Sequence, residues 1–238
     1  MKILVISDLH LCDTRNGNIT DEFRLEQLGN FIREKQIDAV LNLGDTVSRD
    51  ALRHDKFPTL ESGFEFYLKW RSQFTIPFVE TAIHRELKFF RALFGYETDS
   101  FHNLFDDGAI IAMLPMGEEA NTFTASQIEF LRSSLKECAG KTVVIGTHSP
   151  FTGSCSRIGP PGTYVDVPPE VREELFNFPG RIIWCGGHFH WENEPPTVTG
   201  SFTALYGSRF RLLAKNDTTY TSTIDTATGK ITVDFPDF

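Results

Sequence analysis

The sequence contains no long hydrophobic run. Its N-terminal stretch MKILVISDLH has only four consecutive apolar residues, Ile3 to Ile6, before Ser7 and Asp8. That is too short for the apolar region of a signal peptide, and no later segment approaches the length that a membrane span needs. We therefore expect a cytoplasmic protein that does not enter a membrane.

Cysteine is scarce, and its spacing is irregular. The four cysteines, Cys12, Cys138, Cys155 and Cys185, form no CxxC pair. Neither a zinc ribbon nor a disulfide framework is expected from such spacing, and we interpret the four side chains as reduced thiols in a cytosolic protein.

Basic residues are outnumbered. Lys and Arg total 23 against 32 Asp and Glu, and the net charge is −9. This balance argues against nonspecific nucleic-acid binding, although an anionic small substrate remains compatible with a locally positive site. The chain also has no linker, no low-complexity tract and no internal repeat. Its 238 residues, 40% of them hydrophobic, suffice for one sizeable core, so we predict a single domain over residues 1–238.

Short apolar runs alternate with amphipathic segments along most of the chain. Strands are predicted at 2–7, 39–44, 76–81, 109–114, 141–150 and 181–190, and helices at 21–35, 60–74, 84–94, 125–138 and 171–176. Thr124 or Ser126 is the expected N-cap of the fourth helix. Residues 219–235 alternate around the turn TATGK and predict a hairpin. The alternation predicts an α/β fold with a mostly parallel sheet, and the hairpin suggests a second sheet.

Carboxylates and imidazoles follow the predicted strands. Asp8 and His10 follow the first, Asp45 the second, His84 the third, His148 a later one, and His188 and His190 the last. In a strand, residues two apart point to the same side, so Asp8 pairs with His10 and His188 with His190, while Leu9 and Phe189 point into the fold. Any one such residue is more often structural than functional. The joint pattern favours a common site beyond the carboxyl ends of the sheet.

These side chains are the ligands that zinc, manganese and iron prefer. Apart from His84, four histidines and two aspartates exceed what one four-coordinate ion needs, so a two-metal site fits better. Glycines at 44, 186 and 187 allow the backbone to approach closely there.

The segments SDLH, LGD, TAIH, GTHSP and GGHFH, in this order, resemble the signature of the calcineurin-like metallophosphoesterase superfamily. The resemblance extends over nearly the whole chain. Residues 124–151 are especially similar to the branch that includes bacterial cyclic-nucleotide phosphodiesterases. The resemblance implies a four-layer αββα sandwich of two mixed sheets flanked by helices.

The same resemblance implies roles for individual residues. Asp8, His10 and His190 would hold one ion, and His148 and His188 the second, with Asp45 bridging both. His84 would lie close to the leaving group as its acid, a role that suits an imidazole titrating near neutral pH.

The sequence departs from the family pattern at one ligand. The family's G-N-H falls on Ala82, Ile83 and His84, and the Ile83 side chain cannot coordinate a cation. Three outcomes are open: water or a nearby group such as Asn42, Glu80 or Thr81 replaces the missing Asn, the second ion binds weakly, or activity is reduced. We favour the first two.

The sequence thus predicts an enzyme that hydrolyses a small phosphodiester, with a cyclic nucleotide as one candidate, by attack of a metal-bridging hydroxide on phosphorus. The alternatives are a phosphomonoesterase or a nucleotide-lipid pyrophosphatase of the same superfamily, or a non-catalytic binding module on a degraded metal site. The oligomeric state is open.

Overall fold

The structure is a computed structural model, and it describes residues 1–12, 20–48, 59–83, 86–87, 89, 92, 99–119, 121–153, 163–189, 196–206, 208–209 and 220–234. His84, His190 and Cys155 lie outside these residues. Cys12, Cys138 and Cys185 are free thiols. Burial raises the pKa of the Cys185 thiol well above its usual range, which keeps it protonated and unreactive.

Two six-stranded mixed sheets form the centre of the fold. The first has the order β10-β11-β1-β2-β3, with β12 also paired to β11, and the second has the order β4-β5-β6-β7-β9-β8. The strands of the first sheet are β1 (Lys2–Ile6), β2 (Ala39–Asn42), β3 (Phe78–Glu80), β10 (Ser208–Arg209), β11 (Tyr220–Asp225) and β12 (Ile231–Asp234). Those of the second are β4 (Asp99–Phe105), β5 (Gly108–Met113), β6 (Thr142–Gly146), β7 (Arg181–Gly186), β8 (Thr197–Thr199) and β9 (Phe202–Tyr206).

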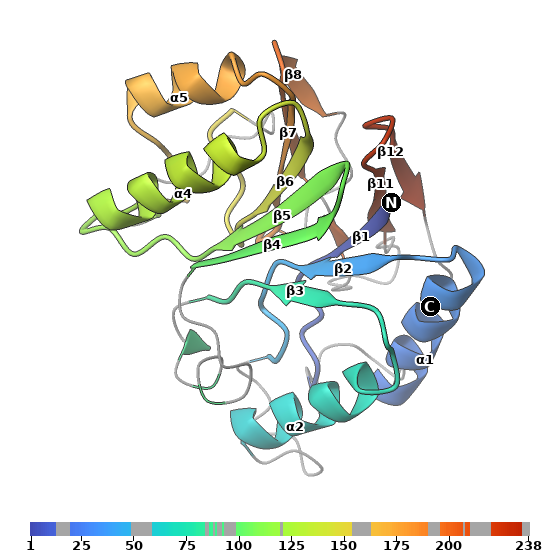
Figure 1. Ribbon diagram of the computed structural model, residues 1–238. Coiled ribbons are helices and arrows are strands. Elements are labelled where there is room, and N and C mark those ends of the chain that lie inside the picture. Colours follow the sequence, from blue (N-terminus) through green and yellow to red (C-terminus); the bar gives the residue numbers. More distant parts are fainter. Residues whose placement is uncertain are drawn as a thin grey trace.

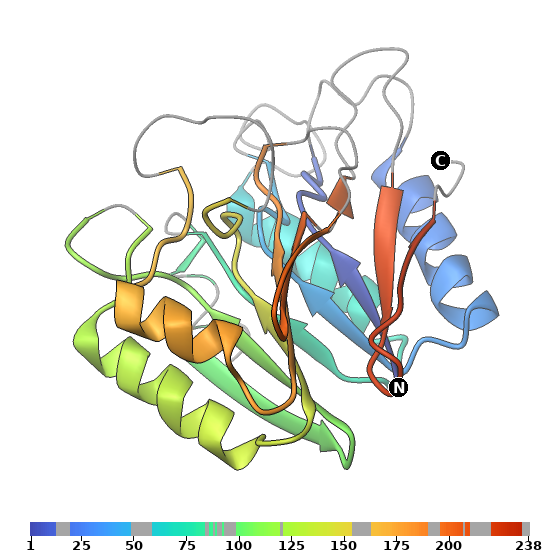
Figure 2. The same cartoon turned by 90° about the horizontal axis from the view of Figure 1, so that it is seen from above.

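Helices cover the outer face of each sheet. Helices α1 (Asp21–Glu34) and α2 (Leu60–Arg71) lie on the first sheet, and α4 (Ala125–Glu137) and α5 (Pro169–Phe176) lie on the second, on opposite sides of the molecule (Figures 1 and 2). The predicted αββα sandwich is thereby confirmed. Within the described part of the chain, no helix has the length and apolarity to cross a membrane.

Three hydrophobic cores separate the four layers, and strand alternation explains them. In β1, Leu4 and Ile6 pack with the residues of α1 and α2, whereas Ile3 and Val5 face the opposite sheet. In the second sheet, β7 likewise turns Trp184 toward α4 and α5 and Ile183 toward the first sheet. Strands buried on both faces need continuous apolar runs, which is why these segments were recognisable in the sequence.

Helix starts follow local capping chemistry. The Thr124 hydroxyl accepts a hydrogen bond from the Gln127 backbone N–H at 3.2 Å, and the Gln127 side chain accepts one from the Thr124 N–H in return. This capping box fixes the start of α4. Of the two predicted N-caps, Thr124 is therefore correct.

Several edge elements departed from the prediction. The hairpin of β11 and β12 is confirmed as an antiparallel pair, but it joins β1 in the first sheet, whereas the second sheet contains the predicted parallel strands β5, β6 and β7. Strand β4, however, was missed, because its sequence DSFHNLF carries polar residues and its pairing with β5 has an irregularity between His102 and Phe105. Strands β8, β9 and β10 were also missed. They are short and carry no long apolar run, so their composition does not mark them as buried strands. Most of the helix predicted at 84–94 lies outside the described residues.

Candidate metal centre

The loops that follow β1 and β2 run side by side beyond the strands. The Asp8 N–H donates to the Gly44 carbonyl at 3.0 Å, and the His10 N–H donates to the Asp45 carbonyl at 3.1 Å. The Leu11 N–H continues this irregular ladder to the Thr46 carbonyl at 2.9 Å. Because parallel strands end at the same edge of a sheet, these loops carry Asp8, His10 and Asp45 to one place.

The local backbone differs from the strand geometry that the sequence argument assumed. Strands β1 and β7 end at Ile6 and Gly186, before the polar residues begin. Asp8, His10, Asp45 and His188 have left-handed φ angles of 56°, 44°, 53° and 81°. The prediction that strand alternation aligns these side chains is therefore wrong in its geometry. Such backbone costs energy for non-glycine residues and concentrates at functional sites.

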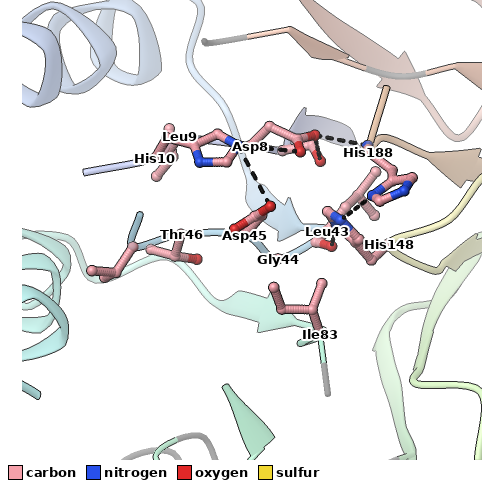
Figure 3. Close-up of polar contacts among 12 residues, drawn as sticks. Asp8, Leu9, His10, Leu43, Gly44, Asp45, Thr46, Ile83, His148 and His188 are labelled. Carbon is pink, nitrogen blue, oxygen red and sulfur yellow. Dashed lines mark hydrogen bonds and ion pairs between the residues drawn. The ribbon is translucent and has the colours of Figure 1, made fainter. Parts of the chain in front are cut away.

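Three buried candidate ligands meet at the centre of the site. One donor atom each from Asp8, Asp45 and His148 lies within 4.8 Å of the other two. The His10 Nε2 atom lies 3.8 Å from Asp8 Oδ1 and 3.5 Å from Asp45 Oδ2. Figure 3 shows His10 on one side of the two carboxylates and the imidazoles of His148 and His188 on the other.

The two imidazoles from the second sheet face each other. The His148 Nε2 atom lies 3.1 Å from His188 Nδ1, and His148 Nδ1 lies 3.0 Å from the Leu43 carbonyl oxygen. A carbonyl only accepts, so this contact places the proton of a neutral His148 on Nδ1 and leaves a lone pair on Nε2. Two nitrogens about 2.1 Å from one ion lie roughly 3 to 3.4 Å apart. The observed separation suits a shared cation.

Asp8 joins the two sheets. Its Oδ2 atom accepts hydrogen bonds from the Ser7 hydroxyl and from the His188 backbone N–H, the latter at 2.9 Å. A Cβ on Gly187 would lie 2.0 Å from Ser7 Oγ and 2.6 Å from Asp8 Oδ2. The close approach of the two loops therefore requires glycine at this position.

The residues present fit a metal centre. Asp8 is fully buried and Asp45 is 7% exposed, so two like charges lie close together away from water. Burial of such a pair is costly unless cations offset it. Carboxylate oxygens and imidazole nitrogens in this arrangement form a donor set for zinc, manganese or iron.

The segment after β3 lies against the Asp45 loop, where the family pattern expects its Asn. A Cβ on Gly44 would lie 3.3 Å from Ala82 Cα. The candidate replacements for that ligand all make other contacts. Asn42 bonds to Thr46 Oγ1 and to the Tyr67 hydroxyl, and the Thr81 hydroxyl donates to the Met113 carbonyl.

Glu80, the third candidate, belongs to a buried pair behind the site. The Tyr67 hydroxyl donates to Glu80 Oε1 at 2.7 Å, and Arg71 Nη1 lies 3.7 Å from the same oxygen. Burial raises the pKa of Glu80 from 4.5 to about 7, an effect that Arg71 and the Tyr67 hydrogen bond partly oppose. Burial, together with the nearby Glu80 charge, raises the pKa of Tyr67.

Sequence reasoning missed one buried carboxylate next to the site. Glu86 is 2% exposed and accepts hydrogen bonds from backbone N–H groups of the Asp45 loop. The sequence did contain one signal for Glu86. It is an acidic residue only two positions after His84, and it therefore lies close to the family motif. His84 and His190 lie outside the described residues, so their positions remain predictions from the sequence.

Comparison with known proteins agrees with this fold. A family model of the calcineurin-like phosphoesterases matches residues 1–192, whereas a comparison with curated proteins finds no significant match. Among solved structures, a dimetal phosphatase from Danio rerio superposes with a TM-score of 0.73 at 10% identity, covering 99% of this chain and 95% of that one. A protein assigned as a 5′-nucleotidase from Staphylococcus aureus gives a TM-score of 0.57 at 15% identity, and the match covers 98% of this chain and 52% of that one. These likenesses show the fold, and the family model decides the membership: the chain belongs to the calcineurin-like phosphoesterase family and is a metal-dependent phosphoric ester hydrolase.

Proposed function

We propose that the protein hydrolyses a small phosphodiester at a centre of two metal ions. Asp8, His10 and His190 would hold one ion and His148 and His188 the other, with Asp45 shared between them. The convergence of donor atoms from Asp8, Asp45 and His148 within 4.8 Å carries this proposal. His10 on one side and His188 on the other support the division into two positions.

When bound, such ions lower the pKa of a coordinated water and offset charge on the phosphoryl oxygens. The protein's own contribution is to orient its metal-binding atoms before an ion binds. The Leu43 carbonyl keeps the proton of His148 on Nδ1, and the His188 N–H fixes the rotamer of Asp8. Partners of this kind orient ligands and typically account for about 10–100-fold in metal affinity.

The two positions are unequal in this proposal. With Ile83 in place of the expected Asn, the ion at His148 and His188 has fewer protein ligands. Asn42, Glu80 and Thr81 make hydrogen bonds to other groups, so water is the expected replacement. The second ion therefore binds more weakly than the first. Stepwise titration with Mn²⁺ should give two unequal affinities, and two equal ones would contradict this part of the proposal.

His84 is proposed as the acid that protonates the leaving oxygen. A positioned general acid contributes about 10²–10⁴-fold, and mainly where the leaving group is poor. His84→Ala should keep the metal content and slow hydrolysis of alkyl esters more than of nitrophenyl esters. Equal losses for both leaving groups would argue against the acid role.

Charge does not decide between a diester and a monoester, because two divalent cations at the site would outweigh the buried carboxylates of Asp8, Asp45 and Glu86. The proposal of a diester therefore rests on the sequence resemblance. A cyclic nucleotide is the diester that the resemblance of residues 124–151 suggests.

The second candidate is a phosphomonoesterase. It is favoured by the similarity to structures described as a dimetal phosphatase and a 5′-nucleotidase. Manganese-dependent hydrolysis of bis-p-nitrophenyl phosphate, of p-nitrophenyl phosphate and of cyclic AMP separates the candidates. Faster turnover of the diesters is expected, whereas faster turnover of the monoester selects the second candidate. Activity on none of them, with no bound metal, would indicate a binding module.

A further inference from the structure

Glu86 is a buried carboxylate outside the proposed ligand set. Its Oε1 atom accepts hydrogen bonds from the backbone N–H groups of Thr46 at 3.0 Å and Val47 at 3.5 Å. Its Oε2 atom accepts from the N–H groups of Asp45 at 3.2 Å and Ile83 at 3.3 Å. One side chain thus receives four backbone donors from two separate segments.

Three of these donors are consecutive and form an anion site. Asp45 has a left-handed φ of 53°, and this conformation turns the N–H groups of Asp45, Thr46 and Val47 toward a common point. Successive N–H groups arranged in this way form a concave nest that favours negative charge. Hydrogen bonds to an ionised acceptor are about twice as strong as neutral ones. Glu86 supplies the charge that this nest requires.

The fourth donor connects the nest to the segment after β3. Ile83 stands where the family pattern expects a ligand, and its N–H shares Glu86 Oε2 with the Asp45 N–H. Figure 3 places Ile83 on the Gly44 side of the site. Glu86 therefore ties together two loops that approach the centre from β2 and from β3.

We infer that Glu86 is a positioning residue that holds the strained Asp45 loop in the conformation needed for metal binding. This inference rests on the proposed role of Asp45 as the bridging ligand. Glu86 acts from behind the loop through main-chain donors, and it touches neither ion nor substrate. Its removal deletes no metal ligand, but it should free the Asp45 backbone to leave its left-handed conformation.

The first test measures the loop without metal. In Glu86→Ala, backbone hydrogen exchange at Asp45, Thr46 and Val47 in the metal-free protein should accelerate by about tenfold or more. Glu65→Ala, which removes an exposed glutamate from α2, is the control and should leave this exchange unchanged. Exchange within twofold of the wild type in Glu86→Ala would overturn the inference.

The second test measures the consequence for metal. Titration calorimetry with Mn²⁺ should show about 10–100-fold weaker binding in Glu86→Ala, with a lower kcat and an unchanged KM for bis-p-nitrophenyl phosphate. Formate, a small carboxylate, should enter the vacated nest and restore part of the Mn²⁺ affinity. If formate does not restore any of the Mn²⁺ affinity, the vacated nest is not the cause of the weaker binding, and the inference is overturned.

Glu86→Gln covers the case in which the alanine variant does not fold. Its amide keeps one acceptor oxygen but presents an NH₂ group to the other pair of donors, so intermediate exchange and intermediate Mn²⁺ affinity are expected. Wild-type exchange and affinity in this variant would overturn the inference. If the wild type binds no Mn²⁺, the proposed function fails, and exchange in the metal-free proteins still decides whether Glu86 holds the loop.

Discussion

The two sheets contribute differently to the centre. The first sheet supplies Asp8, His10 and Asp45, which have left-handed φ angles. They lie on two loops that pair with each other through backbone hydrogen bonds. The second supplies His148, which comes two residues after β6, and His188, which comes two residues after β7. The carboxylates, and hence the negative charge, come from one half, while the other half contributes imidazoles.

This difference separates two physical tasks. The first half must hold two like charges close together, so it uses many main-chain contacts and the buried Glu86 beside the Asp45 loop. The second half holds neutral donors, and one carbonyl contact at Leu43 suffices to orient His148. Electrostatic cost therefore explains why the first half is the more heavily constrained.

Removal of the central carboxylate should have the largest effect. Asp45→Asn keeps the size of the side chain but removes the charge shared by both ions. We expect loss of both ions and a fall in kcat of at least about 1000-fold. Elemental analysis after dialysis checks the metal content. Retention of two ions per chain would contradict the bridging role and with it the division of tasks between the halves.

Removal of an imidazole from the second half should have a smaller and more local effect. His148→Ala deletes one donor of the weaker ion, so the metal content should fall from two ions to one. Activity should decrease by about 100-fold. The matched variant His10→Ala in the first half should instead remove the tighter ion. Equal behaviour of the two variants in stepwise Mn²⁺ titration would show that the halves are not distinct.

The contact between the halves can be broken sterically. In Gly187→Ala, the new Cβ would collide with Ser7 Oγ and Asp8 Oδ2, at a cost of about 1–3 kcal/mol in the free energy of unfolding. Displacement of Asp8 should also weaken Mn²⁺ binding by about tenfold.

Gly140→Ala is the control for this variant. Gly140 has a φ of 83°, and the nearest atom to its added Cβ is 3.9 Å away. It should lose stability through backbone strain but keep its metal affinity. If both variants bind Mn²⁺ like the wild type, the approach of Gly187 to Asp8 is not needed for the centre.

The sequence alone predicted the elements whose signal is local. The continuous apolar runs of β1, β2, β6 and β7 are buried on both faces, so their composition identifies them. The short strands β8 and β10 lack such a signal, because they carry no continuous apolar run. The same limit applies to the hairpin partner of β5, the polar strand β4.

The sequence predicted which residues form the candidate site better than it predicted how their backbone is arranged. The sequence indicated that Asp8, Asp45 and His148 converge. It did so from the expectation of one mostly parallel sheet, whereas β6, which leads to His148, lies in the other sheet from β1 and β2. It did not indicate the left-handed backbone at Asp8 and Asp45, which depends on contacts between loops. Glu86 was missed for a related reason. Its partners are main-chain N–H groups, and these leave no trace in the residue pattern.

The smallest effect on the centre is expected from Glu80, which lies behind the first half and changes stability alone. Glu80 has a pKa of about 7 in the folded protein against 4.5 otherwise, so folding takes up a proton between these values. The stability that Glu80 contributes is therefore present at low pH and lost as pH rises from about 4.5 to 7. The full loss is up to about 3 kcal/mol.

Glu80→Gln removes this titration while keeping an acceptor for the Tyr67 hydroxyl. Relative to the wild type, the variant should gain stability steadily between pH 4.5 and 7 and then level off, as urea denaturation of the metal-free proteins can measure. Use of the difference between the two proteins cancels the titration of the aspartates and histidines of the centre. A difference that is constant with pH would show that Glu80 is ionised in the folded state at all these values, with Arg71 at 3.7 Å offsetting its charge. Glu80, behind the site, would then be stabilised by its ion pair with Arg71. Asp8 and Asp45, at the centre, would in contrast depend on metal.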